Sequence, residues 1–268
     1  MGAFAYLIAG VFGLCVGSFL NVCIVRLPLG QSVVTPRSRC PLCGSGIPWY
    51  DNIPIISFIW LRGRCRACRR AISWRYPAVE FLTAGLSVAT LAASRMVNSW
   101  DWLAYFLYFC CLVAPLIVVT MVDLAHRIIP DLITLPGIAV GFLVRALLAP
   151  AGTFGSEMTD ALIGTVAGGG SLWLVGTIYE RIKKHEGLGG GDVKLAAMIG
   201  AFLGWRALCF VLLSASFLGS VVGIVVILVL RKGLRYAIPF GPFLATGALL
   251  YLYFGEEVLT WYMGFFSP

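Results

Sequence analysis

Charge is scarce in this sequence: 12% of its 268 residues are Asp, Glu, Lys or Arg, whereas 60% are hydrophobic. A water-soluble domain usually carries about twice that share of charge. The chain has no low-complexity stretch and no convincing internal repeat. It also has no G-x-G-x-x-G after a strand, so the usual nucleotide-binding fingerprint is missing. These absences exclude an ordinary soluble protein and a Rossmann-type cofactor domain.

Long apolar runs account for most of the chain, and crossing a bilayer core takes about 20 such residues. The first run lacks a basic segment before it, so we interpret it as a retained helix and not as a signal peptide. The run 192–204 is short for a span and follows directly on a triple glycine. We predict an all-α polytopic membrane protein with about eight transmembrane helices. Their approximate ranges are 3–25, 78–95, 102–122, 132–149, 158–180, 192–204, 207–230 and 239–262.

Only one segment outside the apolar runs is long enough to form a domain of its own. Residues 26–77 are polar, rich in arginine and carry four cysteines. The sequence therefore predicts three parts: a first transmembrane helix at 1–25, a loop domain at 26–77, and a transmembrane bundle at 78–268. A loop of this size can hardly build a stable hydrophobic core, so it needs a covalent or metal staple.

The net charge of +8 is unevenly distributed, which makes nucleic-acid binding a poor explanation for it. Sixteen of the twenty Lys and Arg residues fall in the loop 26–77 or in every second connection after it, and Lys194, near the start of the run 192–204, is the seventeenth on this side. By the positive-inside rule this side faces the cytoplasm, which leaves both termini outside. The basic residues on this side are Arg26, Arg37, Arg39, Arg62, Arg64, Arg66, Arg69, Arg70, Arg75, Arg127, Arg181, Lys183, Lys184, Lys194, Arg231, Lys232 and Arg235; Arg95, Arg145 and Arg206 lie on the other.

Two aspartates stand where apolar runs give way to short polar connections. Asp123 ends one run and Asp192 follows Gly189-Gly190-Gly191. An ionisable group at a membrane helix end is a candidate functional residue, and two paired carboxylates can share a proton and activate water. The charge pattern predicts that both face the cytoplasm at one membrane level. We therefore predict an aspartyl protease pair, in which the glycines leave room for an extended substrate, although close helix packing is the alternative role for them.

The cysteines fall into two groups. Five lie inside apolar runs, where they are expected to be small packing residues. The other four form two C-x-x-C pairs separated by 21 residues, Cys40–Cys43 and Cys65–Cys68. This layout is typical of a structural zinc site with four thiolate ligands. Two disulfides are the alternative, but a cytoplasmic compartment keeps thiols reduced.

Other polar residues have alternative roles or none that can be assigned. Asp131 follows Pro130 at the start of a run, so it is expected either to cap a helix or to contact substrate. Glu80 is expected either to stabilise a cationic amine or methyl donor or to pair with an arginine. His126 is interpreted as a solvated loop residue. Asn21 and Arg26 have no role that chemistry alone assigns.

Six motifs in order make the chain resemble the bacterial type IV prepilin peptidases, the GxGD class of aspartyl proteases. The resemblance covers nearly the whole length. Its parts are Gly17–Pro28, the paired C-x-x-C motifs, Asp51–Pro54 with Arg62–Cys65 and Tyr76–Glu80, Asp123 with Ile129–Asp131, Gly189–Leu195, and Ile238–Ala245.

The resemblance implies two reactions. The enzyme cuts the basic leader from type IV prepilins or type II secretion pseudopilins, and it methylates the new N-terminal amine with S-adenosylmethionine. Asp123 and Asp192 are the implied catalytic residues, and the zinc-bearing loop is the part associated with methylation. The implied setting is the bacterial inner membrane, where the protein also meets lipid. The sequence assigns no residues to the methyl-donor site, and it predicts neither the particular substrate nor the oligomeric state.

Two alternatives remain from the sequence. The protein is a peptidase without methyltransferase activity, or it is a transporter that carries a zinc-ribbon domain and binds a coupling cation through its aspartates. The second alternative fits less well because both aspartates stand at helix ends, whereas transporter sites usually lie near the bilayer midplane.

Overall fold

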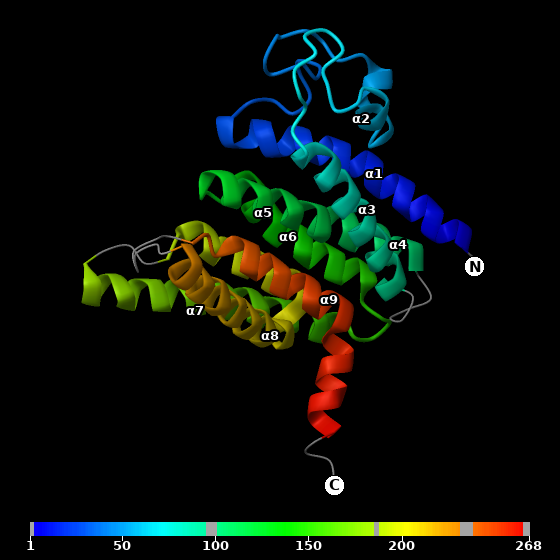
Figure 1. Cartoon of the computed structure of the whole chain (residues 1–268). Coiled ribbons are helices and arrows are strands. Elements are labelled where there is room, and N and C mark those ends of the chain that lie inside the picture. The colour runs from blue at the N-terminus through cyan, green and yellow to red at the C-terminus, as the bar shows by residue number, and fades with distance from the viewer. Residues whose placement is uncertain (1–2, 95–100, 185–187, 231–237, 265–268) are drawn as a thin grey trace. The chain divides into compact units, whose positions relative to one another are not determined.

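The computed structural model describes residues 3–94, 101–184, 188–230 and 238–264, and within these ranges it contains helices and no strand (Figure 1). The prediction of an all-α protein is confirmed. The chain divides into two compact units, residues 1–118 and 119–268, with the boundary inside one helix. Four residues of the predicted charge pattern, Arg95, Arg231, Lys232 and Arg235, lie outside the described residues.

The helices follow the predicted spans closely. Among the described residues, six helices are long and apolar enough to cross a membrane. Two predicted spans, 192–204 and 207–230, both lie within one of these, which is interrupted at Gly204. In the described part of the last helix, the apolar stretch is shorter, Gly241–Gly255. The main helices are α1 (Ala3–Arg26), α3 (Arg75–Ser94), α4 (Asp101–Tyr108), α5 (Ala114–His126), α6 (Asp131–Leu148), α7 (Phe154–Lys183), α8 (Gly190–Leu230) and α9 (Gly241–Gly264).

In the first unit, α1 packs closely against α3 because small residues face each other. A Cβ atom at Gly13 would lie 2.7 Å from Ala84 Cα, and one at Gly17 would lie 2.8 Å from Glu80 Cα. Glycines four residues apart let membrane helices approach to backbone contact. The buried Ser87 hydroxyl adds a polar link, donating to the Ala9 carbonyl at 2.7 Å. This pair of helices therefore forms a close-packed base for the loop that connects them.

An aromatic cluster completes the membrane part of the first unit. A π-helical turn, η3 (Phe109–Val113), joins α4 to α5. Tyr105 and Phe109 stack with ring centroids 5.8 Å apart, and Phe12 of α1 packs against both rings. The Tyr105 hydroxyl lies 2.7 Å from the Ser87 hydroxyl, so the buried phenol has a hydrogen-bond partner. Burying these rings and satisfying the phenol fixes α4 against α1 and α3.

The loop between α1 and α3 contains two hairpins of the same design. The Cys40 amide donates to the Ser45 carbonyl at 2.9 Å, and the Cys65 amide donates to the Arg70 carbonyl at 2.9 Å. An isolated bridge closes each hairpin, Arg39 with Gly46 and Arg64 with Ala71. All of these partners are offset by 25 residues along the chain. The expectation that the sequence holds no internal repeat is therefore wrong for this short segment.

The residue after the second cysteine of each hairpin has a left-handed backbone, but only one of these two residues is glycine. Gly44 has φ +72°, and Arg69 at the equivalent position has φ +59°. A residue with a Cβ atom is strained in this region, whereas glycine is not. The second hairpin thus holds a conformation that its own sequence disfavours, so its surroundings must stabilise it.

The rest of the loop is tied to the hairpins by ion pairs and backbone contacts. The Arg66 guanidinium donates twice to Asp51, at 2.6 and 2.7 Å. This bond lowers the pKa of the Asp51 carboxyl. Arg26, at the end of α1, donates to the Ser32 and Pro36 carbonyls at 2.9 and 2.8 Å. The role that the sequence left open for Arg26 is to fix the start of the loop.

The second unit is built around the contact between α7 and α8. A Cβ atom at Gly164 would lie 2.5 Å from the Gly200 carbonyl oxygen, and one at Gly168 would lie 2.6 Å from the Ala196 carbonyl oxygen. The two helices thus pack backbone against backbone, which is favourable where lipid supplies no hydrophobic drive between helices. Met198 packs against the backbone of Gly137 on α6. The buried stretch of α8 from Leu195 to Phe202 is therefore covered from two sides.

Helix α8 is broken at Gly204, whose backbone (φ +81°, ψ 178°) is not helical. This break is the boundary that the sequence predicted between the spans 192–204 and 207–230. Asp160 of α7 contacts Gly204 and pairs with Arg145 of α6 at 2.5 Å, and Arg145 also pairs with Glu157 at 2.7 Å. The break therefore lies next to a cluster of three charged side chains from two other helices.

Candidate active site and metal centre

Asp123 lies in the last turn of α5, with its side chain buried in the second unit. Only 5% of the residue is exposed. Its Oδ2 atom accepts a hydrogen bond from the Gly241 amide at 3.1 Å. Gly241 is the first residue of α9, so its amide has no partner within the helix and is free to donate to the carboxyl group.

Asp192 lies in the first turn of α8, after the triple glycine. Its amide donates to the Gly189 carbonyl at 3.0 Å, and 9% of the residue is exposed. The Oδ1 atom is buried without a hydrogen-bond partner among the described residues. The carboxyl groups of Asp192 and Asp123 are close enough to interact electrostatically. The structure thus brings together the two aspartates that the sequence selected, 69 residues apart, with one oxygen left to bind water or substrate.

Ile129 explains how three separate motifs meet at this point. A Cβ atom at Gly191 would lie 2.8 Å from Ile129 Cβ, and one at Gly241 would lie 3.0 Å from Ile129 Cδ1. The added atom at Gly241 would also lie 2.6 Å from Asp123 Oδ2. Ile129 therefore fills the space that the two glycines leave open beside the aspartates. These three residues belong to sequence motifs, but the sequence did not predict that they contact one another. Their position beside an aspartate or a proline was the only feature in the sequence that pointed to them.

The four cysteines of the two hairpins come together in the first unit. Cys40, Cys43, Cys65 and Cys68 place all their sulfur atoms within 4.8 Å of one another, and the sulfurs of Cys40 and Cys68 are 3.9 Å apart. Four thiolates around a tetrahedral zinc ion have neighbouring sulfurs about 3.8 Å apart. The cluster therefore fits zinc, with four protein ligands and no open position for chemistry. All nine cysteines are free, so the alternative of two disulfides is not seen.

Local hydrogen bonds favour thiolates in this cluster. Donors from the Ser45 side chain and backbone lower the pKa of Cys43 to about 6. The backbone amides of Cys68 and Ala67 lower the pKa of Cys65. The Arg70 amide also donates to Cys68, but desolvation and the neighbouring sulfurs raise the pKa of Cys68 to about 11. Sulfur atoms packed this closely cannot all be charged without a cation, which a zinc ion would provide.

The structure gives partners for Asp131 and Glu80, the two residues with alternative predicted roles. Asp131 does not cap α6, because the capping position is Pro130 and Asp131 is the first helical residue. Its carboxylate instead pairs with the Lys194 ammonium at 2.7 Å, so the capping expectation is wrong. Glu80 accepts from the Ile55 amide at 2.8 Å, and no arginine pairs with it among the described residues. His126 is exposed, as predicted, but it is the last residue of α5 and not a loop residue.

Comparison with known proteins identifies two family models along the chain. Residues 11–94 match the bacterial peptidase A24 N-terminal domain, and residues 110–224 match the type IV leader peptidase family. These matches cover the loop with its cysteines and both aspartates.

Curated relatives match over most of the chain. A prepilin leader peptidase/N-methyltransferase from Aeromonas hydrophila is 40% identical, with 94% of this chain and 92% of the relative aligned. Proteins with the same description from Stutzerimonas stutzeri and Myxococcus xanthus are 36% and 46% identical, over 97% and 81% of this chain. The alignment covers 94% of the first relative and 62% of the second. No solved structure gives a significant match.

Proposed function

The chain belongs to the type IV leader peptidase family, and from this premise we propose that it cleaves the basic leader of type IV prepilins or type II secretion pseudopilins. We propose further that it methylates the new N-terminal amine. The observation that carries the proposal is the buried pair Asp123 and Asp192, held on the ends of two helices within a family of aspartic peptidases.

Cleavage follows from the chemistry of a paired carboxyl site. One carboxylate removes a proton from water, while the other carboxyl group, protonated, donates a hydrogen bond to the scissile carbonyl. The pair shares its protons, so the two roles belong to the pair and not to one aspartate. The Gly241 amide fixes Asp123, and the buried Oδ1 atom of Asp192 has no partner among the described residues to compete with substrate. This arrangement supports hydrolysis of an extended peptide beside the triple glycine.

The second reaction requires a methyl donor, for which we propose S-adenosylmethionine. We assign this reaction to the first unit, where zinc bound by Cys40, Cys43, Cys65 and Cys68 would hold the loop 26–77 in shape. The metal would have four thiolate ligands and therefore supplies structure, not chemistry. The three-part division of the chain at residues 25 and 77 stays our proposal for how the activities are distributed.

The protein is a multi-pass membrane protein of a bacterial inner-membrane family, and we propose that its active site faces the cytoplasm. The support is the concentration of basic residues in the loop 26–77 and in alternate connections. A basic leader that remains in the cytoplasm would then reach the aspartates without crossing the bilayer.

One assay tests both reactions. Purified protein is incubated with a prepilin and a methyl donor labelled on its methyl group, and the mass and label of the product are read together. A shortened, labelled pilin is the expected product. A shortened pilin without label would indicate a peptidase without methyltransferase activity, and an unchanged pilin would overturn the proposed function.

A further inference from the structure

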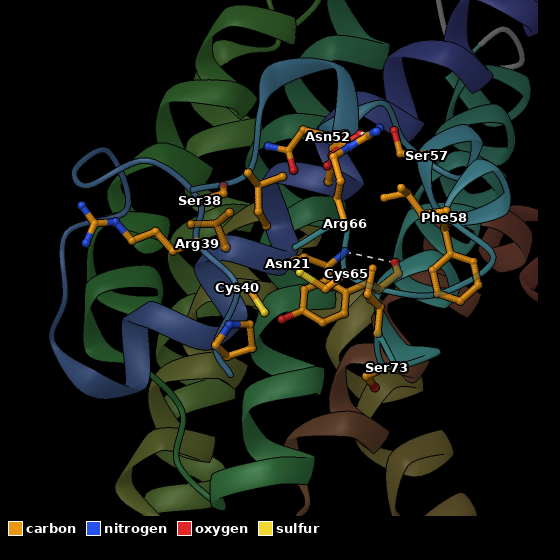
Figure 2. Close-up of a pocket in the computed structure, with 18 of the residues that line it drawn as sticks. Asn21, Ser38, Arg39, Cys40, Asn52, Ser57, Phe58, Cys65, Arg66 and Ser73 are labelled. Atoms are coloured by element: carbon orange, nitrogen blue, oxygen red, sulfur yellow. Dashed lines mark hydrogen bonds and ion pairs between the residues drawn. The ribbon is translucent and has the colours of Figure 1, made fainter. Parts of the chain in front are cut away.

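A cavity of about 770 Å³ lies within the first unit, between the end of α1, the zinc-binding hairpins and the start of α3 (Figure 2). Ligand pockets usually measure about 300–1,000 Å³ and combine apolar walls with a few polar groups. Most of the lining side chains here are apolar or uncharged, and Cys40 and Cys65 form part of the wall. In Figure 2, Asn21, Cys40, Cys65 and Arg66 surround this space from separate segments of the chain.

Asn21 gives the cavity an unused acceptor. The residue is 3% exposed, and its Nδ2 atom donates to the carbonyl oxygens of Tyr76 and Gly17, at 3.0 and 3.3 Å. These two bonds fix the amide, which leaves Oδ1 buried with no partner in the described chain. A buried polar atom without a partner is costly, and a ligand with positive character would satisfy it.

Glu80 adds a carboxylate to the same wall. It is 8% exposed, it accepts from the Ile55 amide, and no cationic side chain pairs with it in the described part of the molecule. A buried carboxylate without a cationic partner is rarely retained for stability alone. Arg75 lines the same cavity, and its buried Nε donor is also unpartnered. The cavity thus offers two acceptors for a cation and one donor for an anion.

We propose that this cavity binds S-adenosylmethionine, with Glu80 and Asn21 facing the sulfonium and Arg75 facing the carboxylate. The inference rests on the proposed function, because it assigns the methyl-donor site of that activity to particular residues. The donor carries a sulfonium, an α-ammonium and a carboxylate, so it has cations for Glu80 and Asn21 and an anion for Arg75. S-adenosylhomocysteine keeps the ammonium and lacks the sulfonium, so comparing the two ligands shows which cation Glu80 faces. Since Cys40 and Cys65 line the same cavity, the cysteine hairpins form part of its wall, and a zinc ion bound by them would support donor binding.

Methyl transfer at this site balances as follows. The pilin amine first loses a proton to water, and its lone pair then forms the new N–C bond. The C–S bond breaks, its electron pair remains on sulfur, and the sulfonium becomes a neutral thioether. The cation that Glu80 and Asn21 face is therefore lost in the product, so the site should hold the donor more tightly than S-adenosylhomocysteine.

The test compares the two ligands on full-length protein in lipid nanodiscs by titration calorimetry. Glu80→Gln keeps the shape of the side chain and removes its charge. It should raise the Kd for S-adenosylmethionine about tenfold, and the Kd for S-adenosylhomocysteine by less than about twofold, because only the first ligand carries the sulfonium. Glu180→Gln, on the exposed end of α7, is the matched control and should change neither Kd. An equal change for both ligands, or no change, would overturn the assignment.

A second measurement needs no variant. A photoactivatable azide of S-adenosylmethionine is crosslinked to the unmodified protein, and the labelled peptides are mapped. Label within residues 18–80, competed by unlabelled donor, supports the site. Label confined to residues 119–268, in protein that methylates pilin, overturns the site and leaves the proposed function intact. If the protein neither binds the donor nor methylates pilin, both the methyltransferase function and this site are rejected.

Discussion

The two units of this protein use the same helix packing but hold their polar residues in different ways. In both, glycines spaced four residues apart bring helix backbones together, Gly13 and Gly17 in the first unit and Gly164 and Gly168 in the second. The first unit places its polar chemistry in a loop, which two cysteine hairpins fold into shape. The second unit places its two aspartates on helix ends, where helix packing and the Gly241 amide position them.

This difference indicates what each site depends on. A small loop gains most of its order from ligands that close it, so its structure should depend on the metal. The aspartate pair depends on close packing around Ile129, so its geometry should depend on side-chain volume. Damage to one unit should therefore affect one reaction more than the other, and each of the following experiments tests that separation.

The largest effect is expected from the aspartates. Asp123→Asn or Asp192→Asn keeps the side-chain shape and removes the titratable group, so cleavage should fall by about 10³-fold or more. Each single variant should be about as inactive as the double, because the pair acts as a unit. Initial rates on a prepilin measure this, and methylation of pre-cleaved pilin by the same variants serves as the control. Near-normal cleavage by either single variant would remove that residue from the catalytic role.

The next effect should fall on the first unit. Cys40→Ser/Cys43→Ser removes half of the thiolate ligands, so zinc content should drop from about one ion per chain and the loop should lose order. Methylation should then decrease more than cleavage, with both initial rates measured on the same pilin sequence. Elemental analysis of fresh, reduced protein gives the metal content.

Two results would contradict this expectation. Absence of zinc from the unmodified protein would reject the metal site. Full methylation with abolished cleavage in the variant would assign the loop to the protease, and the separation between the units would be lost.

A smaller effect should come from packing beside the aspartates. Gly191→Ala places a Cβ atom 2.8 Å from Ile129 Cβ, so the start of α8 and the connection between α5 and α6 must move apart. A displacement of this order costs roughly ten- to a hundredfold in cleavage rate. Adding Ile129→Gly, which removes that Cβ atom, should restore part of the rate by making room for the new methyl group. Gly170→Ala, where the added atom contacts nothing within 4 Å, is the matched control.

The outcome of that pair of variants decides between two roles for the glycines. Rescue by Ile129→Gly supports a packing role for Gly191. Loss of cleavage without any rescue would instead favour the role in which the backbone must stay open for substrate.

The smallest effect concerns the unequal hairpins of the first unit. Gly44→Ala should destabilise the loop by about 1 kcal/mol, because alanine disfavours φ +72°. Arg69→Gly should stabilise it by a similar amount, since the strain at φ +59° is relieved. The midpoint of zinc release in guanidinium chloride reports both. Gly46→Ala, at a position with open space, should shift the midpoint less than Gly44→Ala, and equal shifts would show that backbone strain is not the cause.

The sequence alone determined those features that depend on local pattern. Hydropathy over about 20 residues encodes a membrane helix, because a span must satisfy its own backbone hydrogen bonds within one segment. The spacing of Cys40, Cys43, Cys65 and Cys68 predicted the cluster, because each hairpin is a short closed unit. The break between two predicted spans coincided with Gly204 for the same local reason.

Tertiary structure alone decided which distant groups meet. The sequence selected Asp123 and Asp192, but the amide of Gly241 and the side chain of Ile129 reach them only through helix packing. Asp131 was expected either to cap its helix or to contact substrate; it does not cap the helix and pairs with Lys194, 63 residues away. Such contacts depend on side-chain volumes and on how helices approach each other. The spacing of residues along the chain predicts neither. Among the described residues, Oδ1 of Asn21 has no hydrogen-bond partner and Glu80 has no cationic partner, which the tertiary structure shows for the same reason.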